Sequence, residues 1–239
     1  MLNVSIILAA AGLSVRMGGD VKKPYLPIKG RPIIQYAVEN FLGVSGVRQL
    51  ILVVGAPELE EVRDELGRKY NDNKHGVGLK IVPGGRRRQD SIYQGLKNVD
   101  PQAEIVLVHD AVRPIVTREM IESVINRANA SGAAILAVPV NATVKEVEGV
   151  GGGEGADVEK RIIRTVDRGR LWLAQTPQGF RKDILLRAYD ALIEEDAEVT
   201  DDAQAVERLG HPVEIVPGSH TNIKITTPDD LPIAEALLS

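Results

Sequence analysis

The stretch "ILAAAGLSVRMGG" at residues 7–19 joins an apolar run to a loop rich in very small side chains. The run begins earlier, as "VSIILAA" (4–10), and such unbroken Val, Ile and Leu is typical of a strand covered on both faces. A simple turn needs only a few residues, yet this loop continues through Arg16 to two glycines. Because small residues let a backbone approach a ligand closely, the stretch predicts a first strand that ends in a binding loop.

The rest of the chain alternates short apolar runs with amphipathic segments. The runs predict strands at 49–55, 79–84, 104–110, 133–140, 213–218 and 222–226. The amphipathic segments predict helices at 32–42, 57–70, 88–99, 117–130, 182–195, 201–210 and 227–238. This alternation predicts an α/β fold, with a doubly wound, mostly parallel, Rossmann-like sheet.

Composition limits the kind of protein. The chain has 239 residues, 44% of them hydrophobic, and we expect one domain over 1–239. It has no cysteine, which excludes disulfides and thiolate metal sites and fits a cytoplasmic location. A net charge of −4 provides no general attraction to nucleic acid or to anionic membranes. The first apolar run follows no Lys or Arg and is too short to span a bilayer, so we interpret it as a buried strand and not as a signal peptide.

Residues 141–166 interrupt the alternation. Two β-like runs flank a tip with five glycines in residues 149–155, which predicts a protruding hairpin or arm. A two-stranded ribbon is only marginally stable alone. We therefore expect the arm to pair with the same arm of a second subunit, giving a homodimer; a mobile surface insertion is the alternative.

Ligands of open α/β sheets bind beyond the carboxyl ends of the strands. After the first strand, Ala9–Gly12 leave room for a flat ligand, Arg16 can contact a phosphate, and Lys23 can add a second positive charge. Lys22 could compete for the role of Lys23. The loop lacks the G-K-[ST] of a P-loop, and a glycine-rich turn with solvated cations is the alternative.

The third strand leads into "PGGRRRQDSI" (83–92). Gly84 and Gly85 predict a tight bend, and Ser91 at the start of the next helix can cap that helix or face a base. The run Arg86–Arg88 has no interleaved aromatic residues, so we interpret it as a solvated face and not as a nucleic-acid surface.

Later strand ends carry one acid and further cations. In "VHDAVRP" (108–114), Asp110 is a candidate metal-facing acid and Arg113 a candidate anion contact, whereas His109 is more typical of a packed residue. Lys224 ends the "NIKIT" run. Four histidines without metal-ligand spacing argue against zinc. Cations around one acid outline a polyphosphate site with a divalent cation.

The sequence contains no G-x-S-x-G, no cysteine nucleophile and no convincing Ser/His/Asp set. One reaction class tolerates that absence. A phosphate monoester has a second pKa near ~6 and is largely a dianion at neutral pH, so it needs no general base to attack a nucleoside triphosphate. The protein then only positions the groups and neutralises charge.

Several motifs together resemble one family. In order, they are "LAAAGLSVRM", "KKPYLPIKGRPI", "GGRRRQDSI", "VHDAVRP", "TVDRGRLW", "AQTPQGF", "TDDAQAVE" and "NIKITTPDDL". They are similar to motifs of the 2-C-methyl-D-erythritol 4-phosphate cytidylyltransferases of the non-mevalonate isoprenoid pathway. Pro24 departs from the family pattern, where glutamine is expected, which leaves Lys22 as a fallback for Lys23.

The resemblance implies a nucleotidyltransferase-type fold and a set of site residues. Ala9, Ala10, Ala11 and Gly12, with Gly85, Arg86 and Ser91, would surround cytosine and ribose. Arg16 and Lys23 would hold the triphosphate and stabilise the transition state, and Asp110 would help to place Mg²⁺ and substrate. Arg113, Thr143, Arg168 and Lys224 would face methylerythritol phosphate and the reacting phosphates, with Thr143 and Arg168 serving the partner's site across the arm.

The implied reaction transfers CMP from CTP to methylerythritol phosphate and releases pyrophosphate. Two alternatives remain at this point. A polyol-phosphate cytidylyltransferase, such as one for ribitol 5-phosphate, would share the nucleotide half, and a non-catalytic nucleotide-binding regulator would bind CTP without turnover. No nucleic-acid or membrane partner is expected.

Overall fold

The computed structural model describes residues 2–12, 22–70, 76–148 and 161–238. Within these ranges, seven strands form the central sheet in the order β11-β7-β10-β6-β1-β4-β5. Their bounds are β1 Val4–Ala9, β4 Val47–Val54, β5 Gly78–Pro83, β6 Ile105–Asp110, β7 Ala133–Pro139, β10 Trp172–Arg181 and β11 Glu214–Pro217. β1 pairs in parallel with β4 and β6, as the sequence predicts for buried strands.

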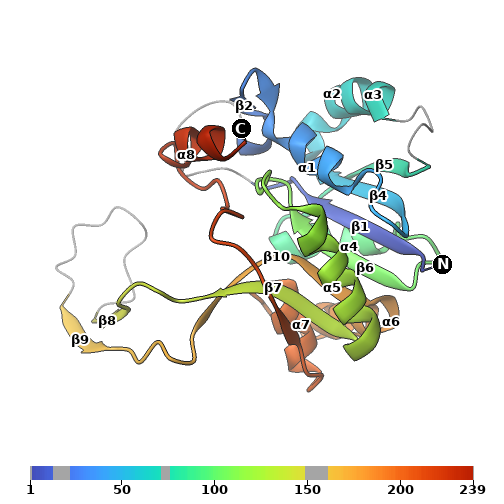
Figure 1. Ribbon diagram of the computed structural model, residues 1–239. Helices are drawn as coiled ribbons and strands as arrows, with labels where there is room; N and C mark the ends of the chain where they lie inside the picture. Colours follow the sequence, from blue (N-terminus) through green and yellow to red (C-terminus); the bar gives the residue numbers. More distant parts are fainter. Residues whose placement is uncertain (1, 13–21, 71–75, 149–160, 239) are drawn as a thin grey trace.

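Helices cover both faces of the sheet (Figure 1). Their bounds are α1 Ile33–Phe41, α4 Arg88–Leu96, α5 Arg118–Ser131, α6 Lys182–Glu194, α7 Asp202–Arg208 and α8 Asp230–Leu237. The side chains of β1 alternate between two cores: Ile6 packs in the cluster of α1 and α5, and Ile7 packs in the cluster of α4, α6 and α7. β1 is therefore a buried central strand, as predicted.

Three sequence predictions about elements need correction. The predicted helix at 57–70 is present but irregular: its successive parts are η3 Ala56–Glu58, α2 Leu59–Val62, a π-helical turn η4 Arg63–Gly67 and α3 Arg68–Tyr70, with no break between them. Residues 222–226 are not a strand. Their polar backbone is bound elsewhere, because the Asn222 carbonyl accepts from Arg113 Nη1 at 2.8 Å and Ile225 N donates to the Val112 carbonyl at 3.0 Å.

The third correction concerns an omission, since the sequence analysis predicts no strand at β10. This strand runs antiparallel to both neighbours, β6 and β7. The sequence does not predict this strand because a proline and polar residues argue against a central strand. These residues are Gln175, Thr176, Pro177 and Gln178. The register shifts between Ala174 and Gln178, so the proline lies at an irregularity of the β7 pairing and removes no regular ladder bond.

Two small sheets lie beside the central one. β2 (Pro27–Ile28) pairs with β3 (Arg31–Pro32) close to the short helix η2 (Lys23–Tyr25). β8 (Lys145–Val147) pairs antiparallel with β9 (Ile162–Thr165). Figure 1 shows β8 and β9 at the far end of a long extension that leaves the body after β7 and returns into β10. The described parts of this arm, 141–148 and 161–166, form the protrusion predicted for 141–166, whereas its predicted glycine-rich tip lies outside the described residues. Among the described residues, no helix combines the length and apolar character needed to cross a membrane.

Candidate active site

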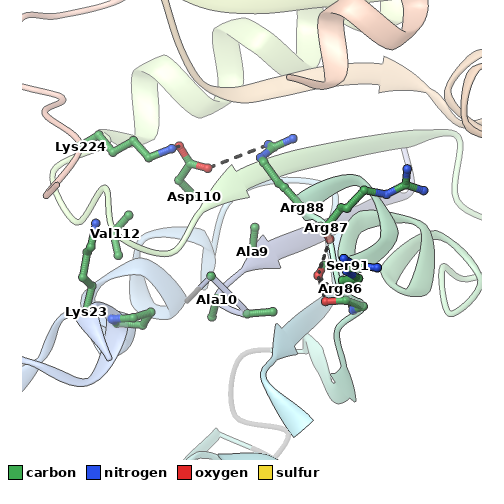
Figure 2. Close-up of a pocket in the computed structure, with 14 residues that line it drawn as sticks. Ala9, Ala10, Lys23, Arg86, Arg87, Arg88, Ser91, Asp110, Val112 and Lys224 are labelled. Atoms are coloured by element: carbon green, nitrogen blue, oxygen red, sulfur yellow. Dashed lines mark hydrogen bonds and ion pairs between the residues drawn. The ribbon is translucent and has the colours of Figure 1, made fainter. Parts of the chain in front are cut away.

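A hollow of about 300 Å³ lies beyond the carboxyl ends of β1 and β6 (Figure 2). The register places Ala9 opposite Asp110, so the last residues of the two strands lie side by side in the lining of the hollow. The lining residues are Ala9, Ala10, Ala11, Gly12, Lys23, Pro24, Gly85, Arg86, Arg87, Arg88, Ser91, Asp110, Val112 and Lys224. The residues predicted to surround the cytosine and ribose are therefore brought together in one hollow with Asp110.

Close packing explains the small residues after two strands: Gly84 and Gly85 follow β5, and Ala11 follows β1. A Cβ on Gly84 would lie 2.5 Å from the Ala11 Cβ and 2.8 Å from the Ser91 hydroxyl oxygen. A Cβ on Gly85 would lie 2.5 Å from the Cβ of Asp90. These neighbours are stiff, so no larger residue fits either glycine without a backbone shift. The two loops pack against each other through their backbones.

Ser91 fixes the second loop. Its hydroxyl accepts a hydrogen bond from Gly85 N at 3.1 Å and lies 3.2 Å from the Arg87 carbonyl, to which it can donate. Asp90 accepts from Arg87 N at 3.0 Å and pairs with the Arg87 guanidinium, which closes the start of α4. Ser91 thus holds the glycine bend, and it also lines the hollow.

The predicted solvated face of the arginine run holds for Arg86, which is exposed, but not for Arg87 and Arg88, which are half-buried and paired. Arg87 is paired with Asp90 and, at 3.0 Å, with Asp196. Arg88 makes two hydrogen bonds to Asp202, with Nη2 to Oδ2 at 2.6 Å and Nη1 to Oδ1 at 3.1 Å. Spacing along the sequence cannot reveal these pairs, because Asp196 and Asp202 come more than a hundred residues later.

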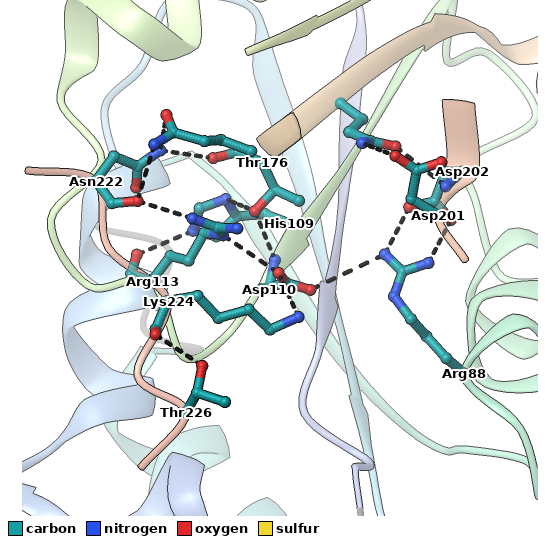
Figure 3. Close-up of polar contacts among 12 residues, drawn as sticks. Arg88, His109, Asp110, Arg113, Thr176, Asp201, Asp202, Asn222, Lys224 and Thr226 are labelled. Carbon is teal, nitrogen blue, oxygen red and sulfur yellow. Dashed lines mark hydrogen bonds and ion pairs between the residues drawn. The ribbon is translucent and has the colours of Figure 1, made fainter. Parts of the chain in front are cut away.

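Asp110 lies at the centre of a cationic cluster (Figure 3). Its Oδ2 lies 3.0 Å from Lys224 Nζ and 3.3 Å from Arg113 Nε, while its Oδ1 faces Arg88 Nη2 at 3.9 Å. Burial raises the pKa of this carboxyl, but Lys224, Arg88 and Arg113 together outweigh burial and hold the pKa well below its usual range. Asp110 is therefore ionised at any physiological pH.

His109, the residue before Asp110 on β6, is linked to the Asp110 backbone through Thr176. Its Nε2 lies 3.1 Å from the Arg113 carbonyl, and its Nδ1 lies 3.0 Å from the Thr176 hydroxyl, which accepts from Asp110 N at 3.1 Å. Burial lowers the pKa of His109 to about 4, so the ring is neutral at pH 7. A ring protonated at Nε2 satisfies both contacts, because a carbonyl only accepts. The prediction of a packed histidine is confirmed.

The structure separates the two adjacent lysines. Lys23 lines the hollow, whereas Lys22 forms an ion pair of 2.7 Å with Glu58 and lines a different depression with Tyr25. Lys23 is therefore the better candidate for a triphosphate contact. Arg16 lies outside the described residues, and its predicted role stays a prediction.

A second hollow of about 250 Å³ adjoins the first. Its lining includes Arg113 and Thr176, and it shares Arg88, Asp110 and Lys224 with the first hollow. Those three residues stand where the two hollows meet. Two ligands that fill the hollows would meet over this charged group.

Thr143 and Arg168 line neither hollow. Thr143 is exposed between β7 and β8, and Arg168, also exposed, donates to the Asn141 carbonyl at the base of the arm. They lie on the two legs of the same arm, as the sequence predicts. Within this chain the arm does not bring them to the predicted substrate site.

The donor set limits how a metal could bind. Across the described ranges no group of three His, Cys, Asp or Glu residues could hold an ion. Asp110 contributes one carboxylate to the hollow. Mg²⁺ is commonly held by one or two carboxylates together with substrate phosphates, so the single carboxylate of Asp110 fits an ion that is held mainly by the phosphates of a nucleotide.

A doubly wound sheet with a small-residue strand end and cations around one buried carboxylate has the arrangement of a nucleotidyltransferase. The model of the family "IspD: 2-C-methyl-D-erythritol 4-phosphate cytidylyltransferase" matches residues 4–239. The chain belongs to this family.

Individual relatives agree with the family match. The chain is 46% identical over 235 residues to the cytidylyltransferase of that name from Syntrophus aciditrophicus, covering 98% of this chain and 95% of the relative. It is 42% identical to the one from Alkaliphilus oremlandii, over 98% and 94% of the two chains. The crystal structure of 4-diphosphocytidyl-2C-methyl-D-erythritol synthase from Anaerococcus prevotii superposes with a TM-score of 0.82 at 30% identity, covering 99% of this chain and 96% of that one. The mostly parallel α/β fold predicted from the sequence is confirmed.

Proposed function

We propose that this chain transfers CMP from CTP to 2-C-methyl-D-erythritol 4-phosphate, giving 4-diphosphocytidyl-2-C-methyl-D-erythritol and pyrophosphate in the synthesis of isoprenoid precursors. Family membership supports the reaction. The structural observation that carries the proposal is the meeting of two hollows over Asp110, Lys224 and Arg88. The first would hold the nucleotide and the second the acceptor phosphate.

The reaction needs no protein nucleophile. An oxygen of the acceptor phosphate attacks the α-phosphorus of CTP, a new P–O bond forms, and the bond from the α-phosphorus to the bridging oxygen breaks. Pyrophosphate leaves with that electron pair. The attacking phosphate is already largely a dianion at neutral pH. The protein therefore acts by aligning the two phosphates and by offsetting charge on the transferred group.

The cations at the hollow would each contact a different part of the reacting phosphates. Lys23, with Arg16 from the same loop, would bind the triphosphate and offset the charge that grows on the leaving pyrophosphate. Lys224 and Arg113 would orient the acceptor phosphate. Mg²⁺, held by Asp110 and the substrate phosphates, would neutralise phosphate charge.

Base selection would depend on the backbone of the two packed loops. Ala9–Gly12, with Gly85, Arg86 and Ser91, would surround the cytosine and ribose. Backbone carbonyls would accept from the exocyclic amine of cytosine and would be left unpaired by uracil. Polar mismatches of this kind discriminate by roughly 10⁴ or more, so UTP should be a poor substrate.

The working unit would be a homodimer joined by the 141–166 arm. Thr143 and Arg168 stand on the arm, away from the hollows of their own chain. Ile162 and Ile163 on β9 are 62% and 54% exposed, an apolar surface that a second arm would cover. Thr143 and Arg168 would then complete the partner's acceptor site. A cytoplasmic location, without nucleic-acid or membrane partners, completes the proposal.

The test is pyrophosphate release by the purified protein with Mg²⁺. CTP is paired with methylerythritol 4-phosphate, with ribitol 5-phosphate or with no acceptor, and UTP and ATP serve as nucleotide controls. Turnover with CTP and methylerythritol phosphate alone is expected. Turnover with ribitol phosphate would assign a polyol-phosphate cytidylyltransferase, and CTP binding without turnover would indicate a regulatory protein.

A further inference from the structure

We propose that Asp202 is a positioning residue of this reaction: it fixes the Arg88 guanidinium at the junction of the two hollows, so that Arg88 contacts the transferred phosphate. The inference rests on the proposed function. Asp202 itself lines neither hollow, and its side chain is fully buried at 0% exposure. A charged residue at such a position needs a partner, and Arg88 is that partner.

The geometry of the pair fixes the direction of the guanidinium. Both terminal nitrogens of Arg88 are bonded to the two carboxylate oxygens of Asp202, at 3.1 and 2.6 Å. A two-pronged pair of this kind restricts rotation of the planar group. Arg88 nevertheless lines both hollows, so part of the guanidinium stays available to ligands.

Asp202 is itself held on two sides. The Tyr189 hydroxyl donates to its Oδ1 at 2.5 Å, and Gln178 Oε1 accepts from Asp202 N at 3.1 Å and from Ala203 N at 2.9 Å. These contacts tie the start of α7 to α6 and β10. The carboxylate therefore has a fixed place from which to hold Arg88.

The distances explain what this arrangement achieves. Arg88 Nη2 is 2.6 Å from Asp202 Oδ2 and 3.9 Å from Asp110 Oδ1, so Asp202 holds the guanidinium away from a close, hydrogen-bonded pair with Asp110 and leaves only a long ion pair (Figure 3). Lys224 and Arg113 approach the other oxygen of Asp110. Without the charge of Asp202, Arg88 would close onto Asp110 and its cationic face would leave the path of the phosphate.

Burial and charge agree with this direction. Burial lowers the pKa of Arg88, but Asp202 and Asp110 together outweigh burial and raise the pKa above its ordinary value. The guanidinium remains charged beside the reacting phosphates.

The first experiment measures pyrophosphate release with CTP and methylerythritol 4-phosphate. D202N keeps the shape of the side chain and removes its charge. We expect kcat to fall about 10- to 100-fold, as for a misplaced catalytic group, while the KM for CTP changes less than about threefold. R208A is the matched control, because Arg208 lies on the same helix and pairs with exposed Glu195; its kcat should equal that of the wild type.

A second experiment tests positioning directly. In R88A, added guanidinium ion should bind against Asp202 and restore part of kcat, whereas it should restore none in R88A/D202N. A purely structural role of Asp202 predicts lower thermal stability with unchanged kcat in D202N and equal rescue in both Arg88 variants, and either result overturns the inference.

Two further outcomes are separable. A wild-type enzyme without turnover contradicts the proposed function and not the geometry of the pair. If D202N does not fold, Y189F is the milder variant, since it removes one support of Asp202 and leaves the ion pair in place. We then expect kcat to fall about 3- to 10-fold with KM for CTP unchanged, and an unchanged kcat counts against the inference.

Discussion

The hollow at the sheet edge and the arm at 141–166 differ in whether their side chains have partners within the chain. At the hollow, distant parts of the same chain supply partners: Lys224 pairs with Asp110, Asp202 with Arg88, and the Asn222 carbonyl accepts from Arg113. On the arm, β8 and β9 pair with each other, and Ile162 and Ile163 stay exposed. The comparison teaches that the charged side chains of the hollow are paired within the chain, whereas the arm leaves apolar side chains exposed, which is why we propose a second arm as its partner.

The strongest test of the hollow is D110N. This change leaves Lys224, Arg113 and Arg88 around a neutral amide, so the cations lose the group that positions them. We expect kcat to fall about 10³-fold, the upper range for one lost electrostatic group, and thermal stability to fall as well, since a buried pair is broken. Steady-state kinetics and a melting curve measure both. A variant with near-normal kcat would remove Asp110 from the site.

The two lysines of the first loop provide a paired test. K23A should lower kcat about 100-fold, because Lys23 lines the hollow. K22A should change kcat less than about threefold, because Lys22 pairs with Glu58 outside it. Both are measured in the pyrophosphate assay. The reverse result would assign the triphosphate contact to Lys22.

Deletion of residues 145–160 tests the arm. We expect a monomer by light scattering and a kcat about 100-fold lower, because Thr143 and Arg168 no longer reach a second site. The melting temperature should change little, since residues 145–148, the described part of the deleted segment, do not belong to the three apolar cores of the body. A monomer with full activity would contradict the proposed dimer.

The smallest effect on activity is expected at His109. A group with a folded pKa near 4 and an unfolded pKa near ~6.5 binds more protons when unfolded. Stability is therefore complete above pH ~6.5 and falls as the pH drops toward 4, by about 3 kcal/mol over the interval. Urea unfolding at several pH values should show this slope in the wild type and a flatter one in H109Q. Equal slopes in the two proteins would show that His109 does not cause the pH dependence.

Much of the site could be predicted because it follows from strand ends. Parallel strands bring the residues at their carboxyl ends together. The residues at the ends of the apolar runs are Ala9–Gly12, Gly85 and Asp110. The partners of Arg88 could not be predicted, since an ion pair between α4 and α7 depends on tertiary packing. β10 could not be predicted for a related reason, because Gln175 and Gln178 are typical of loops. Their side-chain amides are satisfied only by tertiary contacts, with the Ser219 carbonyl and the Asp201 carboxylate.

The two legs of the arm continue β7 and β10, which pair from Pro139 and Trp172 to Ala133 and Phe180. A tension applied at the arm is thus carried along covalent backbone into the middle of the sheet. The stretch around Thr176, where the register with β7 shifts, lies on that path, and the Thr176 hydroxyl accepts from the backbone of Asp110. The arm and the candidate site are therefore joined by one continuous stretch of backbone.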